Sequence, residues 1–252
     1  MGSGSPSGSI GPAIADYVKQ CSGVLERAFC LNYRLSSAAP FKAENPFPAP
    51  LIDALAGYRY LVEILGFKAT NVIVSGDSAG GHLALGLVRY LTQEAIPALP
   101  PPGAAVLLSP TGEWVCTQDA NLDSSMTRNA RSDVVQVILQ SGYTARALCG
   151  SLPEGSAITN SWISPSSLRI DTRGLFANFP PTLILAGGAE QTLDAIKTLY
   201  DRLQNDNDAD KIKYVEYPEA SHDFIMAAYH EPEKTEGAKE VARWLGMAYG
   251  TQ

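Results

Sequence analysis

The sequence reads Asn71-Val72-Ile73-Val74-Ser75-Gly76-Asp77-Ser78-Ala79-Gly80 at the point that decides the fold. The apolar run predicts a buried strand, and the apolar spacing from His82 to Leu91 predicts a helix directly after it. Gly76 and Gly80 leave room for a sharp turn in which the serine itself is strained. This turn would lift the Ser78 hydroxyl to the carboxyl edge of a parallel sheet. We interpret it as a nucleophile elbow, with a strand–turn–helix connection capped by serine as the alternative.

A serine nucleophile needs a general base, and the chain has three histidines. His82 lies on the helix that the elbow starts and is expected to point away from Ser78. His230 lies in a predicted surface loop. His222 follows an alternating run at 213–217, which predicts a last strand. Because loops at the carboxyl ends of strands carry the chemistry of such sheets, we predict that His222 is the base.

An acid that orients the base should follow another strand, between the serine and the histidine in chain order. Residues 181–186 predict that strand, and two carboxylates come after it. Glu190 lies close to the strand end, where its side chain could reach an imidazole. Asp194 lies in the first turn of the next helix, where it would favour the helix dipole. We favour Glu190 as the acid and keep Asp194 as the alternative.

Further motifs occur along nearly the whole chain in a family-like order: Asn32-Tyr33-Arg34-Leu35, Asn45 to Pro50, Gly76 to Gly81, Leu107 to Pro110, Trp162 to Pro165, Pro180 to Ile184 and Ser221 to Phe224. Together they resemble the hormone-sensitive-lipase (fold-3) group of α/β-hydrolase esterases. Ser78 matches the nucleophile of that family and His222 its histidine. Glu190 falls where most members carry Asp, in a Gly-Gly-Ala-Glu form similar to fungal steryl-acetyl-hydrolase-like members.

The resemblance implies an α/β-hydrolase fold, with a mostly parallel sheet flanked by helices in a single domain over residues 1–252. It also implies that residues 110–180 form a cap-like insertion over the pocket; a lateral packing helix with long loops is the alternative. The expected activity is serine carboxylic-ester hydrolysis through an acyl-enzyme, on small to medium acyl esters and without a cofactor. An amidase or deacetylase on the same scaffold stays open.

A second departure from the family is that the sequence contains no His-Gly-Gly-Gly motif, whose amides form most of the oxyanion hole in its members. Residues 1–6 resemble the segment that follows this motif, so we expect an N-terminally truncated chain; a linker over residues 2–9 would fit equally well. The amide of Ala79 is then the one predicted oxyanion donor. A catalytically silent ligand-binding module or an inactive fragment is therefore the alternative function.

The composition excludes several other classes. The net charge of −7 does not favour binding to nucleic acid, which is itself negatively charged. No apolar stretch approaches the roughly 18 residues of a membrane-spanning helix. Four cysteines without a C-x-x-C pair, beside scattered histidines, predict no metal site. The cysteines are expected to be small buried side chains, Cys30 within a strand. We expect a cytoplasmic protein with a small-molecule ester substrate, and the oligomeric state is left open.

The remaining elements follow from hydrophobic periodicity and from turn residues. The spacing predicts helices at residues 14–27, 51–65 with a C-cap at Gly66, 133–148 and 235–247, and strands at 28–33, 104–109 and 211–217. A strand normally found between 28–33 and 71–75 in the resembled fold has no counterpart in the sequence.

Overall fold

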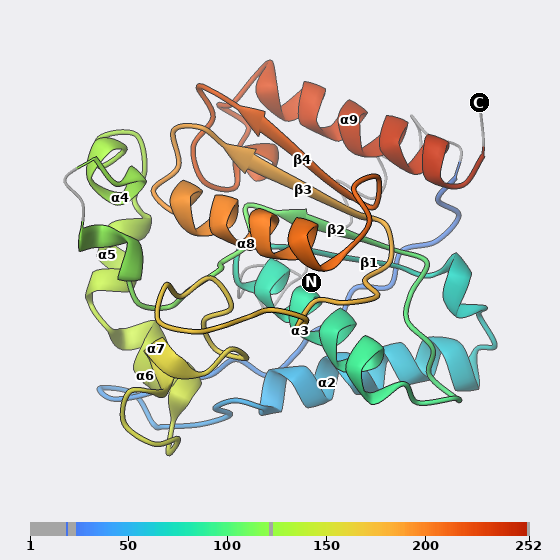
Figure 1. Cartoon of the computed structure of the whole chain (residues 1–252), viewed down its shortest axis with the longest axis horizontal. Coiled ribbons are helices and arrows are strands. Elements are labelled where there is room, and N and C mark those ends of the chain that lie inside the picture. The colour runs from blue at the N-terminus through green and yellow to red at the C-terminus, as the bar shows by residue number, and fades with distance from the viewer. Residues whose placement is uncertain (1–18, 20–23, 121–122, 251–252) are drawn as a thin grey trace.

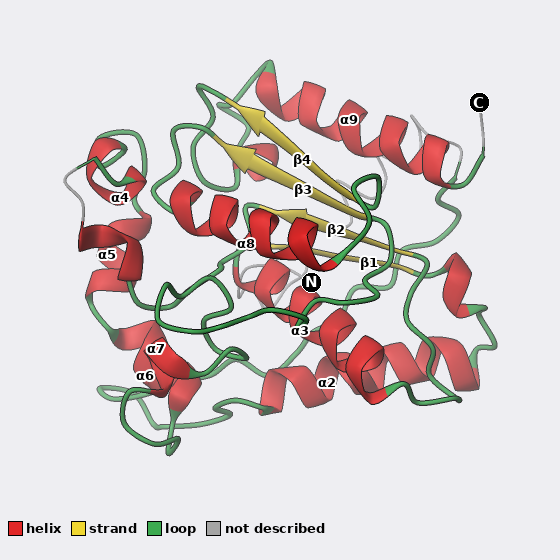
Figure 2. Cartoon of the chain, viewed as in Figure 1, coloured by secondary structure: helices red, strands yellow, loops and turns green. Residues whose placement is uncertain are grey.

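The computed structural model describes residues 19, 24–120 and 123–250. Its centre is a parallel sheet of four strands in chain order: β1 (Ile73–Asp77), β2 (Ala104–Leu108), β3 (Thr182–Gly187) and β4 (Ile212–Tyr217). Parallel neighbours need crossover connections, which place the helices on the faces of the sheet. Figures 1 and 2 show this layered arrangement.

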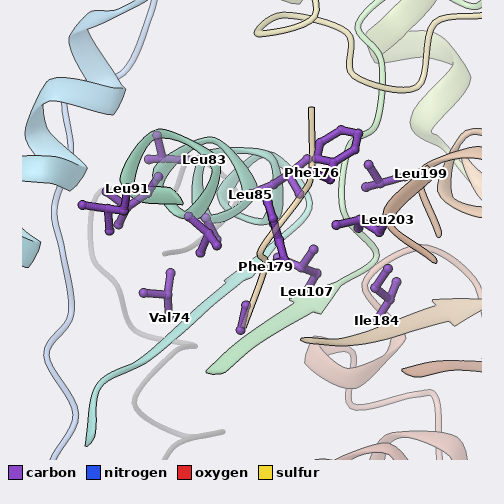
Figure 3. Packing of buried hydrophobic residues seen from close by; sticks show 14 of the residues in the cluster. Val74, Leu83, Leu85, Leu91, Leu107, Phe176, Phe179, Ile184, Leu199 and Leu203 are labelled. Carbon is purple, nitrogen blue, oxygen red and sulfur yellow. The ribbon is translucent and has the colours of Figure 1, made fainter. Parts of the chain in front are cut away.

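The two faces of the sheet are covered by different helices, because alternate residues of a strand point to opposite sides. On one face, Leu107 and Ile184 pack against α3 (Ala79–Glu94) and α8 (Leu193–Asp206), as Figure 3 shows. On the other face, Val106 and Leu185 pack against α9 (Glu233–Ala248). Both faces of the central strands are therefore buried in apolar contacts.

The chain connects β2 to β3 through a long insertion, although the two strands are neighbours in the sheet. The described residues of the insertion hold η3 (Thr117–Ala120), α4 (Ser125–Arg128), α5 (Val135–Gln140), α6 (Tyr143–Cys149) and α7 (Ser156–Thr159), and no strand. The single helix predicted at 133–148 was wrong, since α5 and α6 are separate. Gly142 between them adopts a positive φ of 64°, a conformation that ends a helix.

The strand predicted at residues 28–33 was also wrong, because residues 24–35 form no regular element. A strand is stabilised by hydrogen bonds to a neighbour, and no described strand lies beside this segment. Phe29 instead contacts Tyr60, with ring centroids 6.1 Å apart, and Cys30 is exposed rather than buried. The helix predicted at 14–27 lies largely outside the described residues, and its last four positions are not helical.

Most other boundaries fall close to their predicted positions. The helix predicted at 51–65 appears as α2 (Ala49–Arg59), which continues as the π-helix η1 (Tyr60–Ile64); the C-cap predicted at Gly66 is confirmed by its φ of 72°. A short 3₁₀ turn, η2 (Ala69–Asn71), delays the start of β1 relative to the prediction. Among the described residues, no helix combines the length and apolar character that crossing a bilayer requires.

The strand–turn–helix expected around Ser78 is present between β1 and α3. Ser78 has a φ of 49° and a ψ of −116°, a conformation that is strained for a residue with a side chain. Its N–H donates to the carbonyl of Leu108 at 2.9 Å, which ties the turn to β2. A Cβ atom on Gly76 would lie 2.1 Å from the carbonyl oxygen of Gly80. The turn therefore requires glycine at position 76.

This close approach leads to a stability prediction. Gly76→Ala should lower the free energy of unfolding by about 3 kcal/mol or more, because backbone and not a movable side chain blocks the new methyl group. Gly86→Ala is the matched control: its Cβ would meet Leu51 Cδ1 at 3.8 Å, an ordinary contact inside α3. Denaturant unfolding followed by circular dichroism measures both. Equal stability of the two variants would contradict the close packing of the turn.

Candidate active site

A cavity of about 390 Å³ lies over Ser78 and His222, both of which line it. The wall is mainly apolar and aromatic. It is formed by the segment before α2, by α2 and α3, and by the insertion, with Tyr33, Leu51, Leu83, Trp114, Ile138, Tyr143 and Trp162 among its residues. The insertion thus contributes side chains from α5 and α6 to the same cavity as the serine.

Three of the residues singled out in the sequence meet in one chain of short contacts. Ser78 Oγ lies 2.8 Å from His222 Nε2, and His222 Nδ1 lies 2.8 Å from Glu190 Oε2. The residues come from the turn after β1, the loop after β4 and the loop after β3. With Nδ1 donating its proton to the carboxylate, Nε2 is left to accept the proton of the serine hydroxyl.

The Glu190 carboxylate is completely buried and has partners on both oxygens. Oε1 accepts from Gly187 N at 2.6 Å and from Ser109 Oγ at 3.2 Å. Oε2 accepts from Thr192 Oγ1 at 2.7 Å, beside the histidine. A buried carboxylate that accepts several hydrogen bonds is held in its position and its charge is compensated. The orientation of His222 is therefore fixed by a rigid group.

Asp194, the alternative acid, lies elsewhere. Its Oδ2 accepts from the backbone N–H of Ser125 at 2.7 Å, and its Oδ1 lies 3.9 Å from an Arg128 nitrogen. It therefore holds the start of α4 against α8. The structure brings Glu190, and not Asp194, to the imidazole.

The other two histidines have different surroundings. His82 lines the cavity, with Nδ1 3.2 Å from the carbonyl oxygen of Thr111 and its ring edge-on to Trp114. Burial lowers the pKa of His82 to about 4, so that it is neutral near pH 7. His230, predicted in a surface loop, is half-buried instead. Its Nε2 lies 2.7 Å from Ser221 Oγ, a hydrogen bond that helps to hold the residue before His222 in place.

The insertion is tied to the loop that carries Glu190. Asn129 Nδ2 donates to the carbonyl oxygens of Gly188, at 3.1 Å, and Glu190, at 2.8 Å. Gln191 accepts from Gln136 N at 2.8 Å and donates to the carbonyl of Met126 at 3.0 Å. Because the same loop carries Glu190 and binds the insertion, the insertion has a fixed position relative to His222.

Sequence reasoning missed four polar residues around these groups. Thr192 contacts both Glu190 and His222, and Ser109 donates to Glu190. Thr111 Oγ1 lies 3.4 Å from Ser78 Oγ. Asp223 lines the cavity, with Oδ2 3.6 Å from His222 Nε2. Ser109 and Thr111 follow β2 at its carboxyl end, the same positional signal that pointed to Glu190 and His222.

The charges around His222 favour its protonated form. Burial opposes the imidazolium, but the carboxylates of Asp223 and Glu190 outweigh it and raise the pKa of His222 to about 9. Burial also raises the pKa of the Asp223 carboxyl to about 7, although the nearby His222 acts in the opposite direction. The site therefore stabilises a positive charge on the imidazole.

Ala79, the predicted oxyanion donor, is the first residue of α3 and lines the cavity beside Ser78. The first N–H groups of a helix have no carbonyl partner within that helix. Ala79 as an oxyanion donor stays a prediction.

Comparisons with known proteins identify the fold family of the chain. A family model described as alpha/beta hydrolase fold matches residues 16–226. An acetyl-hydrolase from Streptomyces hygroscopicus is 30% identical over 198 residues, which are 79% of this chain and 58% of the relative. An esterase from Acinetobacter venetianus is 30% identical over 208 residues, 81% of this chain and 61% of the relative. The chain thus spans about three fifths of the length of these curated relatives.

Solved structures give the same result. An esterase/lipase from an uncultured bacterium superposes with a TM-score of 0.73 at 25% identity, covering 94% of this chain and 70% of that chain. An esterase from the bacterial hormone-sensitive lipase family superposes with a TM-score of 0.71 at 25% identity, with the same coverage. The predicted fold class is confirmed, and the chain belongs to the alpha/beta hydrolase fold family.

Proposed function

We propose that the chain is a serine carboxylic-ester hydrolase in which Ser78 is the nucleophile, His222 the general base and Glu190 the acid. The observation that carries the proposal is the pair of 2.8 Å contacts that His222 makes, one from each ring nitrogen, to Ser78 and Glu190. A nucleophile, a base and an orienting carboxylate at these distances form the arrangement that acyl transfer requires.

In the proposed reaction, Ser78 Oγ attacks the ester carbonyl while its proton passes to His222 Nε2. Glu190 stabilises the resulting imidazolium through Nδ1, and the Ala79 amide donates to the oxyanion. The same Nε2 proton then goes to the leaving alcohol, and an acyl group remains on Ser78. Water, activated by His222, releases the acid and restores the serine. No step needs a cofactor.

The substrate class follows from the cavity. Its volume of about 390 Å³ and its apolar, aromatic wall fit a small or medium acyl group and disfavour a charged one. The similarity to an acetyl-hydrolase and to esterases supports this choice. We assign to residues 110–180 the role of a cap, because α5 and α6 contribute Ile138 and Tyr143 to the cavity. Similarity to fungal steryl-acetyl hydrolases stays a prediction.

A catalytically silent binding module is the less favoured function. A module without catalysis would have no need to hold Glu190 in a buried network or to keep Ser78 in a strained conformation. The positions of these two residues favour an enzyme.

The direct test is hydrolysis of p-nitrophenyl butyrate by the chain and by Ser78→Ala. We expect turnover by the parent to vanish in the variant, because no other group would form the acyl-enzyme. Ser151→Ala, at an exposed position in the insertion, is the matched control and should retain parental activity. Equal hydrolysis by the parent and by Ser78→Ala would refute the proposed function.

The identity of the acid is tested by comparing Glu190→Gln with Asp194→Asn in the same assay. Glu190→Gln should lower kcat by about a thousandfold or more, because the amide no longer holds the imidazole in the required tautomer. Asp194→Asn should stay within a few-fold of the parent, since Asp194 contacts α4 and not the imidazole. If Asp194→Asn alone abolished turnover, the assignment of Glu190 would be wrong.

The charges around His222 also predict the pH dependence. A raised pKa means that the imidazole keeps its proton to higher pH, and the base form appears only as the pH rises. The acid limb of kcat/KM should therefore lie above the ordinary imidazole value of 6.5, toward about 9. Ser78→Ala supplies the background at each pH. An acid limb at or below 6.5 would show that the carboxylates do not act on His222.

A further inference from the structure

A second carboxylate lies beside His222, at the ring nitrogen that Glu190 does not contact. Asp223 Oδ2 is 3.6 Å from His222 Nε2, whereas Glu190 Oε2 is 2.8 Å from Nδ1. The imidazole therefore has an acidic side chain at each of its two nitrogens. Asp223 also lines the cavity, next to the atom that would deliver a proton to the leaving alcohol.

The backbone holds Asp223 firmly in this place. Its φ of 55° and ψ of 31° are left-handed, a conformation that Asp and Asn tolerate better than most residues. Its N–H donates to Ser109 Oγ at 3.2 Å, and Ser109 Oγ donates to Glu190 Oε1 at 3.2 Å. One serine hydroxyl thus connects the two segments that carry the carboxylates.

The Asp223 carboxylate makes its one ion-pair contact within the described part of the chain to His222. Its Oδ1 is buried without a hydrogen-bond partner, an unfavourable state for a polar atom. Among the described residues, the basic group within ion-pair distance is His222. A partly buried carboxylate is tolerated when a positive charge lies beside it, so the geometry pairs Asp223 with the protonated imidazole.

We propose that Asp223 is a positioning residue that, together with Glu190, holds the His222 imidazolium between two carboxylates. The proposal rests on the proposed function, because that imidazolium forms when Ser78 gives up its proton. Asp223 itself neither takes nor gives a proton. The proton moves from Ser78 Oγ to His222 Nε2 and then to the leaving oxygen, and Asp223 lowers the free energy of the charged state between the two transfers.

Other carboxylates near His222 cannot take this role. Glu190 is engaged at Nδ1, and Asp133, before α5, accepts from the N–H groups of Val134 and Gln191. Asp77, at the end of β1, is buried and raises the pKa of Asp223. Both Asp133 and Asp223 act on His222 electrostatically, but Asp223 is the one within 4 Å of Nε2 among the described residues.

The test measures the protonation of His222 directly, without activity. The imidazole resonance of His222, assigned with His222→Gln, is titrated by NMR in the parent, in Asp223→Asn and in Glu219→Gln. Glu219 is exposed on the same loop, so its variant removes one negative charge without touching the imidazole. We expect the midpoint to fall by about one to three pH units in Asp223→Asn and to stay unchanged in Glu219→Gln.

An unchanged midpoint in Asp223→Asn would overturn the proposal. Asn tolerates the left-handed backbone, and Asp223→Gly serves in the same titration if the Asn variant does not fold. A kinetic arm separates this proposal from the proposed function. If the parent and both variants all lack esterase activity, but the midpoint still falls in Asp223→Asn, the proposed function fails and the ion pair stands. If the enzyme is active and neither the midpoint nor the acid limb of kcat/KM moves, Asp223 has no such role.

Discussion

The buried carboxylate of Glu190 is the group on which the rest of the site depends. Its partners come from the end of β2, the end of β3, the start of α8 and the loop after β4, through Ser109, Gly187, Thr192 and His222. The loop around Glu190 is thereby joined to two segments far away in the sequence, the end of β2 and the loop after β4. Because an unpaired buried charge is very unfavourable, none of these contacts can be lost alone without affecting the others.

The position of Ser78 is fixed by contacts of the backbone, whereas that of His222 is fixed by a charged side chain. The approach of Gly76 to Gly80 and the hydrogen bond from Ser78 to Leu108 set the hydroxyl at the edge where the imidazole lies. The insertion completes the cavity and is itself bound to the acid loop through Asn129 and Gln191. Ser78, His222 and the insertion are thus held in fixed positions relative to one another, which is the condition for a precise geometry in the proposed reaction.

Much of this arrangement could be predicted from the sequence, because its signals are local. The elbow around Ser78 follows from glycine spacing after an apolar run, and His222 and Glu190 follow from their positions after strands. The strand predicted at 28–33 failed because pairing is not local: an apolar run says nothing about whether a neighbouring strand is there to receive its hydrogen bonds. The contact of Asp223 with His222 Nε2 was equally hidden, since the adjacency of the two residues in the sequence does not say where the carboxylate points. The cytoplasmic location stays a prediction.

The measurement that tests the account most directly is covalent trapping of the nucleophile. The folded chain is treated with a fluorophosphonate ester, and the adduct is located by peptide mass spectrometry. A serine activated by His222 should form a single adduct at Ser78 that is lost when the protein is denatured before treatment. An unmodified Ser78, or labelling that is equal in folded and denatured protein, would contradict the existence of an assembled catalytic site.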